Sequence, residues 1–212
     1  MELKEKAGVC LAYLMQVLIV VFIGIAIYNK NYIGIFNGMI VFIIMSLPFL
    51  LKRRWNITLP WTLNLLIMLS LFLHTGGIVG GWYHTLYPFY DKFAHLIGSI
   101  TIALLGFASV LIIDRYTKVK LTNKAIIFFV IIFTLAVGAI WEIGEFLLDT
   151  FAGTNAQYDG LEGTMLDLIL DSFGGLLAGG IAYFNLRKGK EKFIDKLLRT
   201  MKLKLRIKLR KS

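Results

Sequence analysis

Cysteine, proline and charged side chains are scarce in this chain of 212 residues. Its single cysteine, Cys10, excludes an internal disulfide framework, and its three prolines leave long stretches free to form helices. Charged residues make up 17% of the chain, against about 25% in an average soluble domain. The sequence has no His-Glu-x-x-His motif, no P-loop and no serine nucleophile elbow. It therefore lacks the signatures of three common enzyme classes: zinc proteases, P-loop NTPases and α/β-hydrolases.

Hydrophobic residues account for 58% of the chain and are gathered in blocks of about 20. A helix of that length crosses the ~30 Å hydrocarbon core of a bilayer and satisfies its own backbone hydrogen bonds there. The blocks predict an all-α integral membrane bundle of six transmembrane helices, without internal repeats or a second domain. The predicted spans are residues 8–28, 33–51, 60–80, 93–113, 124–148 and 164–185.

The basic residues predict how the spans are oriented. Lysine and arginine accumulate in the cytoplasmic loops of membrane proteins. With the N-terminus inside, 21 of the 23 basic residues lie on the cytoplasmic side and only Lys30 and Lys92 lie outside. We therefore expect a multi-pass protein of the cell membrane with both termini in the cytoplasm.

The net charge of +10 is concentrated in a predicted tail, residues 187–212, that follows the transmembrane domain of residues 1–186. Apolar residues from Phe193 to Met201 recur on one face of a helix, while lysine and arginine occupy the other positions. A basic amphipathic segment next to a span favours binding to anionic lipid headgroups. Contact with RNA is the weaker alternative, because no aromatic stacking platform accompanies the charges. We expect membrane lipids as partners, and no specific nucleic acid.

Ionisable residues inside the predicted spans, or directly before them, mark the candidate functional positions. Each such residue costs about 2.5–3.5 kcal/mol on insertion scales, so it is rare without a function. Three spans carry them at their outer ends, in pairs spaced three or four residues apart, and each pair therefore projects from one helix face. The pairs are Asp91 and His95, Glu142 and Glu145, and Asp167 and Asp171.

If these three faces converge, an imidazole shares a site with at least four carboxylates. Their mutual repulsion then requires bound cations, shared protons or water. Oxygen-rich sites suit Mg²⁺, Mn²⁺ or Ca²⁺, and an imidazole admits Zn²⁺ or Fe²⁺. We therefore expect a divalent metal ion, with Glu142 or Asp167 left as a general base. The expected metal ligands are Asp91, His95, Glu145 and Asp171.

Two other segments bear on this site. The polar stretch from Asp149 to Gly163 predicts an outer loop. Gly175 and Gly179 form a Gly-x-x-x-Gly motif on the sixth span, which lets helix backbones approach closely. We interpret this motif as internal packing around the acidic site, with homo-oligomerisation as the alternative.

The run Tyr90-Asp91-Lys92-Phe93-Ala94-His95 carries a family resemblance, together with Trp141-Glu142-x-x-Glu145 and Asp167-x-x-x-Asp171. Over residues 60–185 the chain resembles the YjdF-type family (domain of unknown function 2238) of small polytopic membrane proteins. The loop before the last pair reads Asp159-Gly-Leu-Glu-Gly-Thr-Met-Leu-Asp167 and departs from that family's Gly-Thr-Gln-Gly-Asp-x-Trp-Asp. The chain is also similar to VanZ-like proteins, linked to glycopeptide resistance at the cell envelope, which tend to have Gln and Asn in place of Glu145 and Asp171.

Three functions are compatible with an acidic cluster near the outer leaflet. The first is a metal-dependent hydrolase or transferase that acts on a lipid or a lipid-linked envelope precursor. The second is a cation or proton transporter, although no acidic residue continues a pathway through the inner halves of the predicted spans. The third is a non-catalytic envelope protein whose acidic pairs hold helices together.

The predicted orientation can be tested by thiol labelling of intact cells after Cys10→Ser removes the native thiol. A membrane-impermeant maleimide is expected to label Asn155→Cys at once, because this position lies in an outer loop. Lys118→Cys is expected to react only after the membrane is permeabilised. The reverse pattern would invert the topology.

Overall fold

The computed structural model describes residues 3–157, 159–190, 193–195, 197 and 201, and every regular element within them is a helix. Six of these helices are long and apolar enough to cross a membrane. They confirm the predicted all-α architecture with six spans, while the orientation of the termini stays a prediction. The helices are α1 (Leu3–Tyr28), α2 (Tyr32–Trp55), α3 (Trp61–Gly80), α5 (Phe89–Tyr116), α6 (Asn123–Ala152) and α7 (Gly160–Arg187).

Local capping sets several helix ends. Asn31 precedes α2, and its side chain accepts a hydrogen bond from the Gly34 amide at 2.8 Å; Thr122 caps α6 in the same way. These bonds satisfy amides that lack a partner within the helix. Gly81 and Gly153 end α3 and α6 in the left-handed region, with φ of 70° and 63°, a conformation that glycine adopts without steric cost.

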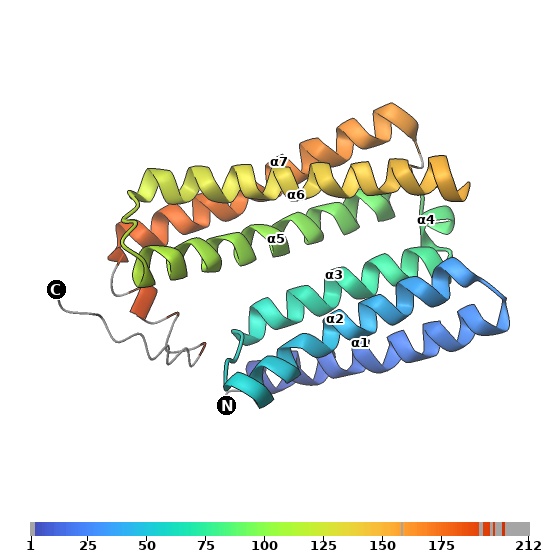
Figure 1. Cartoon of the computed structure of the whole chain (residues 1–212), viewed down its shortest axis with the longest axis horizontal. Helices are drawn as coiled ribbons and strands as arrows, with labels where there is room; N and C mark the ends of the chain where they lie inside the picture. Colours follow the sequence, from blue (N-terminus) through green and yellow to red (C-terminus); the bar gives the residue numbers. More distant parts are fainter. Residues whose placement is uncertain (1–2, 158, 191–192, 196, 198–200, 202–212) are drawn as a thin grey trace.

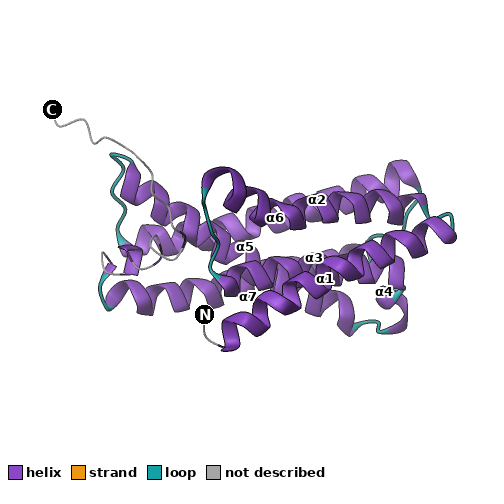
Figure 2. Cartoon of the chain, turned by 90° about the horizontal axis from the view of Figure 1, so that it is seen from below, coloured by secondary structure: helices purple, strands orange, loops and turns teal. Residues whose placement is uncertain are grey.

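The spans form two groups of three (Figure 1). Helices α1, α2 and α3 pack around one apolar cluster that includes Ile19, Met45 and Met68. Helices α5, α6 and α7 pack around another that includes Leu111 and Val130. The two groups meet chiefly where α3 lies against α5, and Figure 2 shows the same long helices from below.

Hydroxyl groups mark the seam between α3 and α5. Ser70 and Thr101 are hydrogen-bonded at 2.9 Å, and the Tyr90 hydroxyl donates to the Leu73 carbonyl at 2.6 Å. Such bonds hold transmembrane helices together because lipid offers no competing partners. The two groups are therefore joined by polar contacts and not by one continuous apolar core.

Successive long helices run in opposite directions, which gives the bundle two distinct ends (Figure 1). One end, here called the site end, contains residues 29–31, 81–88, 153–157 and 159. The other, the basic end, contains residues 56–60 and 117–122. Three acidic pairs on α5, α6 and α7 thus come to the same end, as the sequence predicts.

A short helix, α4 (Trp82–Thr85), lies at the site end and was not predicted. Its rings explain why two glycines lie near the end of α3, within the predicted span of residues 60–80. A Cβ atom at Gly76 would overlap the Trp82 ring, and one at Gly77 would overlap the Tyr83 ring. The glycines therefore do not break α3; they make room for α4 to fold back against it.

The prediction of an outer loop from Asp149 to Gly163 was too long. Helix α6 continues to Ala152 and α7 begins at Gly160, so the connection described is residues 153–157 and 159. The carboxylate of Asp149 accepts hydrogen bonds from the Thr154 hydroxyl and from the amides of Ala156 and Gln157, at 2.5–2.9 Å. Asp149 therefore folds this connection and does not join the cluster on the neighbouring helices.

Part of the predicted tail packs against the bundle. Ile194 is fully buried beside Leu186, and Phe193 stacks on Phe107 with ring centroids 5.7 Å apart. The carbonyl of Met201 accepts a hydrogen bond from the Thr58 amide at 2.9 Å. The apolar stripe is therefore covered by protein at these positions, while residues 202–212, with much of the predicted lipid-binding charge, lie outside the described residues.

The basic end contains an acidic residue that the sequence analysis missed. Asp114 is only 2% exposed and pairs with the Lys190 ammonium at 3.0 Å. Its carboxylate also accepts a hydrogen bond from the Leu121 amide at 2.6 Å. The residue escaped notice because α5 extends three residues beyond the predicted span of 93–113. Its partners indicate a structural clamp between the α5–α6 connection and the segment after α7.

Candidate functional site

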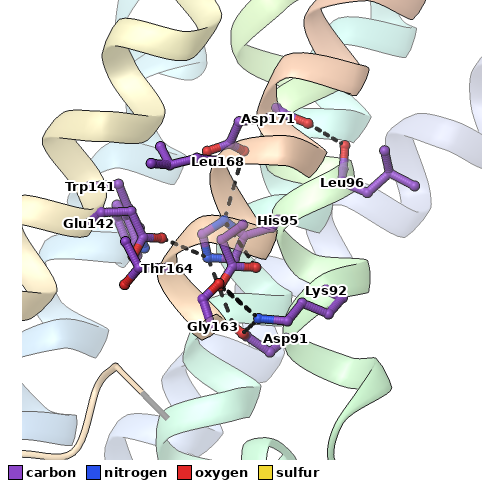
Figure 3. A network of polar contacts seen from close by, with 12 residues as sticks. Asp91, Lys92, His95, Leu96, Trp141, Glu142, Gly163, Thr164, Leu168 and Asp171 are labelled. Atoms are coloured by element: carbon purple, nitrogen blue, oxygen red, sulfur yellow. Dashed lines mark hydrogen bonds and ion pairs between the residues drawn. The ribbon is translucent and has the colours of Figure 1, made fainter. Parts of the chain in front are cut away.

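The acidic cluster is built on consecutive turns of three adjacent helices at the site end (Figure 3). Residues spaced by four project from one face of a helix, so Asp91 and His95 face the interior from the first turns of α5. Asp167 and Asp171 do so from α7, and Glu142 comes from the outer half of α6. The structure therefore brings together five of the six predicted site residues.

His95 lies at the centre of this cluster. Its Nε2 atom is 3.9 Å from Asp91 Oδ1 and 3.8 Å from Glu142 Oε1. On the other side of the ring, Nδ1 is 3.9 Å from Asp167 Oδ1 and 3.7 Å from Asp171 Oδ1. These separations exceed hydrogen-bond distance, so each carboxylate faces the imidazole across a small gap.

Lys92 supplies the cationic side chain of the cluster and was missed as a site residue. Its ammonium donates to Asp167 Oδ2 at 2.8 Å and to Asp91 Oδ2 at 3.1 Å. In both carboxylates, Oδ2 thus accepts a hydrogen bond from Lys92, while Oδ1 faces His95. The sequence could have indicated this role, because Lys92 directly follows Asp91 in the first turn of α5. The sequence analysis used Lys92 only as a basic residue on the outer side for predicting the topology.

Three carboxylate oxygens in the cluster are buried without a hydrogen-bond partner among the described residues. They are Glu142 Oε1, Asp167 Oδ1 and Asp171 Oδ2. Their residues are only 4–5% exposed. A buried polar atom that stays unpaired costs free energy, about 1–3 kcal/mol and more for a charged group. The first two of these atoms face His95, which identifies the gaps around the ring as the place for a further polar or cationic group.

The gaps have dimensions that suit a metal ion. Bonds from Zn²⁺ to nitrogen or carboxylate oxygen measure about 2.0–2.2 Å, so two ligands of one ion lie about 3–4 Å apart. One ligand atom each from Asp91, His95 and Asp167 lies within 4.8 Å of the other two. An oxygen-rich set with one imidazole fits Mg²⁺, Mn²⁺, Zn²⁺ or Fe²⁺.

Glu145 takes a different position from the other five predicted residues. Its Oε1 atom accepts a hydrogen bond from the Trp141 indole on the same helix at 2.9 Å. It is half-buried, whereas Glu142 is buried. The compact ligand set contains Asp167, which the sequence analysis proposed as a base, and it does not contain Glu145.

A second polar group borders the cluster on the side of α3. His74 is 2.9 Å from the Asn37 amide nitrogen and 3.3 Å from the Tyr83 hydroxyl, and its ring meets Trp141 edge-on at 4.7 Å. Burial, followed by the negative charges of Asp91 and Glu145, raises the pKa of Tyr83 well above its usual range. Tyr83 therefore stays protonated beside His74.

Glycines allow the three helices to approach closely enough to form the site. A Cβ atom at Gly138 on α6 would overlap the Asp171 carboxylate, and one at Gly174 would overlap the Ser99 hydroxyl on α5. Gly175 and Gly179 face Thr134 and Ile131 of α6, which supports the interpretation of their motif as internal packing. The sequence analysis missed Gly138, although its position four residues before Glu142 puts it on the same helix face.

We expect Gly138→Ala to destabilise the protein and displace Asp171, because the added methyl group has no space. Overpacking of this kind costs about 1–3 kcal/mol, so thermal unfolding in detergent should show a lower Tm. Gly144→Ala is the matched control on the same helix, since a Cβ atom there meets nothing within 4 Å. Equal Tm values for the two variants would contradict the close approach of α6 and α7.

Comparison with known proteins places the chain in a family. Residues 10–188 match the family described as "Predicted membrane protein (DUF2238)". An uncharacterized protein of Thermotoga maritima is 28% identical over 137 residues, which are 64% of this chain and 69% of that protein. No solved structure matches the chain. The matched range contains all six predicted site residues and confirms the resemblance noted in residues 60–185: the chain belongs to the DUF2238 family of predicted membrane proteins.

Proposed function

We propose that this protein is a metal-dependent membrane enzyme, of the hydrolase or transferase type, acting on a lipid or lipid-linked envelope substrate. The observation that carries the proposal is the pair of buried, unpaired carboxylate oxygens that face His95, Glu142 Oε1 and Asp167 Oδ1. Four carboxylates against one lysine leave a formal excess of three negative charges when His95 is neutral. A divalent cation would offset most of that excess. The predicted topology puts this site near the outer leaflet of the cell membrane.

The geometry supports a role for each side chain. Asp91, His95 and Asp167 form the compact set that would hold the cation. Asp171, whose Oδ1 faces the same ring nitrogen as Asp167 Oδ1, would add a further oxygen. Lys92 orients two of these carboxylates by binding their Oδ2 atoms. A cation held there would activate water and polarise a phosphoryl or carbonyl oxygen.

Glu142 is the candidate general base. Its Oε1 atom is unpaired, buried and 3.8 Å from His95 Nε2, so it can receive a proton beside the ligand set. Asp167, the other candidate from the sequence, already binds Lys92 through Oδ2. We therefore assign proton transfer to Glu142 and a ligand role to Asp167.

Transport by the same carboxylates is the main alternative function. The buried acidic residue at the basic end, Asp114, is held by Lys190. Along α5 it lies 19 residues from His95, about 28 Å at 1.5 Å per residue. The apolar cluster of α5, α6 and α7 fills much of that interval, which favours chemistry at one end over passage through the bundle.

Metal content tests the ligand assignment. Purified wild-type protein is expected to contain a stoichiometric divalent metal by plasma mass spectrometry. Asp167→Asn and Asp171→Asn should lose it, with affinity falling at least about tenfold, while the control Asp149→Asn should retain it. If Glu145→Gln lost the metal and Asp167→Asn retained it, the ligand set predicted from the sequence would be favoured instead. A metal-free wild type after gentle purification would contradict the proposal.

The reaction can be tested with Glu142→Gln in reconstituted vesicles. We expect this variant to keep its metal but to lose about 10²–10⁴-fold in turnover of lipid phosphates or lipid-linked sugars, because it lacks the base. The assay is release of phosphate or of the leaving group. Cation flux into protein-containing vesicles that disappears in Asp171→Asn, without turnover, would place transport first.

A further inference from the structure

A cavity of about 360 Å³ lies between the two groups of helices and opens onto the acidic cluster. This volume falls in the range of small-molecule binding sites, roughly 300–1,000 Å³. Helices α2, α3, α5 and α6 contribute most of the wall, and Asp171 of α7 joins them at the site end. Residues that line it include Ile44, Ile67, Gly98, Ile102, Leu105 and Val137.

The polar groups of this cavity are collected at one end. His74, His95 and Asp171 line it there, beside the unpaired carboxylate oxygens. Farther in, the hydroxyl of Thr134 is bonded to a carbonyl of its own helix, and those of Ser70 and Thr101 bind each other and nearby carbonyls. The deep wall therefore behaves as an apolar surface, and the cavity has a polar head and an apolar body.

The length of the cavity matches one leaflet of a bilayer. From His95 to Leu105 it follows ten residues of α5, which is about 15 Å at 1.5 Å per residue. Half of the ~30 Å hydrocarbon core is also about 15 Å. A chain that enters beside the acidic cluster would thus end near the middle of the membrane.

The lining also reaches the lipid-facing surface. Ile40 and Ile44 of α2 line the cavity and are 40% and 38% exposed, and Trp141 of α6 lines it and is 43% exposed. In a membrane, such exposed side chains on a spanning helix contact hydrocarbon. The cavity lining thus includes exposed side chains of α2 and α6, through which a lipid chain would gain access.

We propose that this cavity binds one hydrocarbon chain of a membrane lipid, with the lipid's polar group beside His95 and Asp171. The substrate class is thus an amphiphile whose chain enters sideways from the leaflet at the site end. This proposal deepens the proposed function and rests on it for the identity of the reacting group. The binding of the chain itself rests only on the shape and chemistry of the cavity.

Gly98 offers a way to fill the cavity without disturbing its walls. It lines the cavity, and a Cβ atom placed there meets nothing within 4 Å. Gly98→Leu would therefore project its side chain into the space of the lipid chain. Gly180→Leu is the matched control. A Cβ atom at Gly180 also meets nothing within 4 Å, but Gly180 lies on α7 and does not line the cavity.

The experiment uses full-length protein in vesicles of phosphatidylethanolamine and phosphatidylglycerol that contain a phospholipid with a diazirine in its acyl chain. After irradiation, peptide mass spectrometry is expected to find label at Ile67, Ile102 or Leu105. Gly98→Leu should reduce that label roughly tenfold, since its side chain excludes several methylene groups. Label at the lipid-facing Phe128 and Ile140, both 67% exposed, is the internal standard.

Two results would overturn the proposal: label confined to the lipid-facing positions in wild type, or cavity label that persists in Gly98→Leu. Unchanged metal content and Tm in Gly98→Leu, beside Gly180→Leu, exclude misfolding as the cause of a loss. Metal analysis separates the two proposals. Cavity label in a metal-free wild type would support the lipid-binding site and contradict the metal-dependent enzyme. Bound metal without cavity label would support the metal site and contradict lipid binding in the cavity.

Discussion

Burying several carboxylates within one membrane-spanning bundle is the constraint on which the rest of this structure depends. Charges in a low-dielectric environment must be paired, neutralised or bound to a cation, because desolvation costs several kcal/mol for each ion. Lys92 satisfies one oxygen of Asp91 and one of Asp167, and thereby turns their remaining oxygens toward His95. The cluster is thus partly compensated by the chain, and two of the oxygens left unpaired, Glu142 Oε1 and Asp167 Oδ1, face His95.

Close helix packing follows from that constraint, because the carboxylates must reach a common point from separate helices. Gly138 leaves the space that the Asp171 carboxylate occupies, and Gly174 lets α7 lie directly against Ser99 of α5. In lipid, helices associate through such close contacts and through hydrogen bonds. The surrounding lipid tails are as apolar as the side chains, so there is no hydrophobic driving force between the helices. The glycines of α6 and α7 are therefore part of the site although they carry no reactive group.

The division into two groups of helices gives the site its surroundings. The apolar clusters of α1–α3 and α5–α7 are separate, and the seam between α3 and α5 is held by hydroxyl groups. The cavity beside this seam follows α5 inward from the polar cluster, and exposed side chains of α2 and α6 form part of its lining. An amphiphile could then present its polar group to His95 while its chain remains in an apolar environment.

The sequence by itself determined the six spans, because about 20 consecutive apolar residues suffice to define a transmembrane helix without reference to the rest of the chain. Helical spacing likewise placed each predicted pair, including Glu142 with Glu145, on one face of its helix at one end, but it left open whether the three faces converge. Local patterns could not show which neighbours a side chain meets. Tertiary structure alone decided that Lys92 joins the cluster, that Asp167 and not Glu145 lies in the compact ligand set, and that Asp149 folds a connection. It also decided that α4 packs on Gly76 and Gly77 and that a cavity lies beside the cluster, since these features depend on distances between helices that are far apart in sequence.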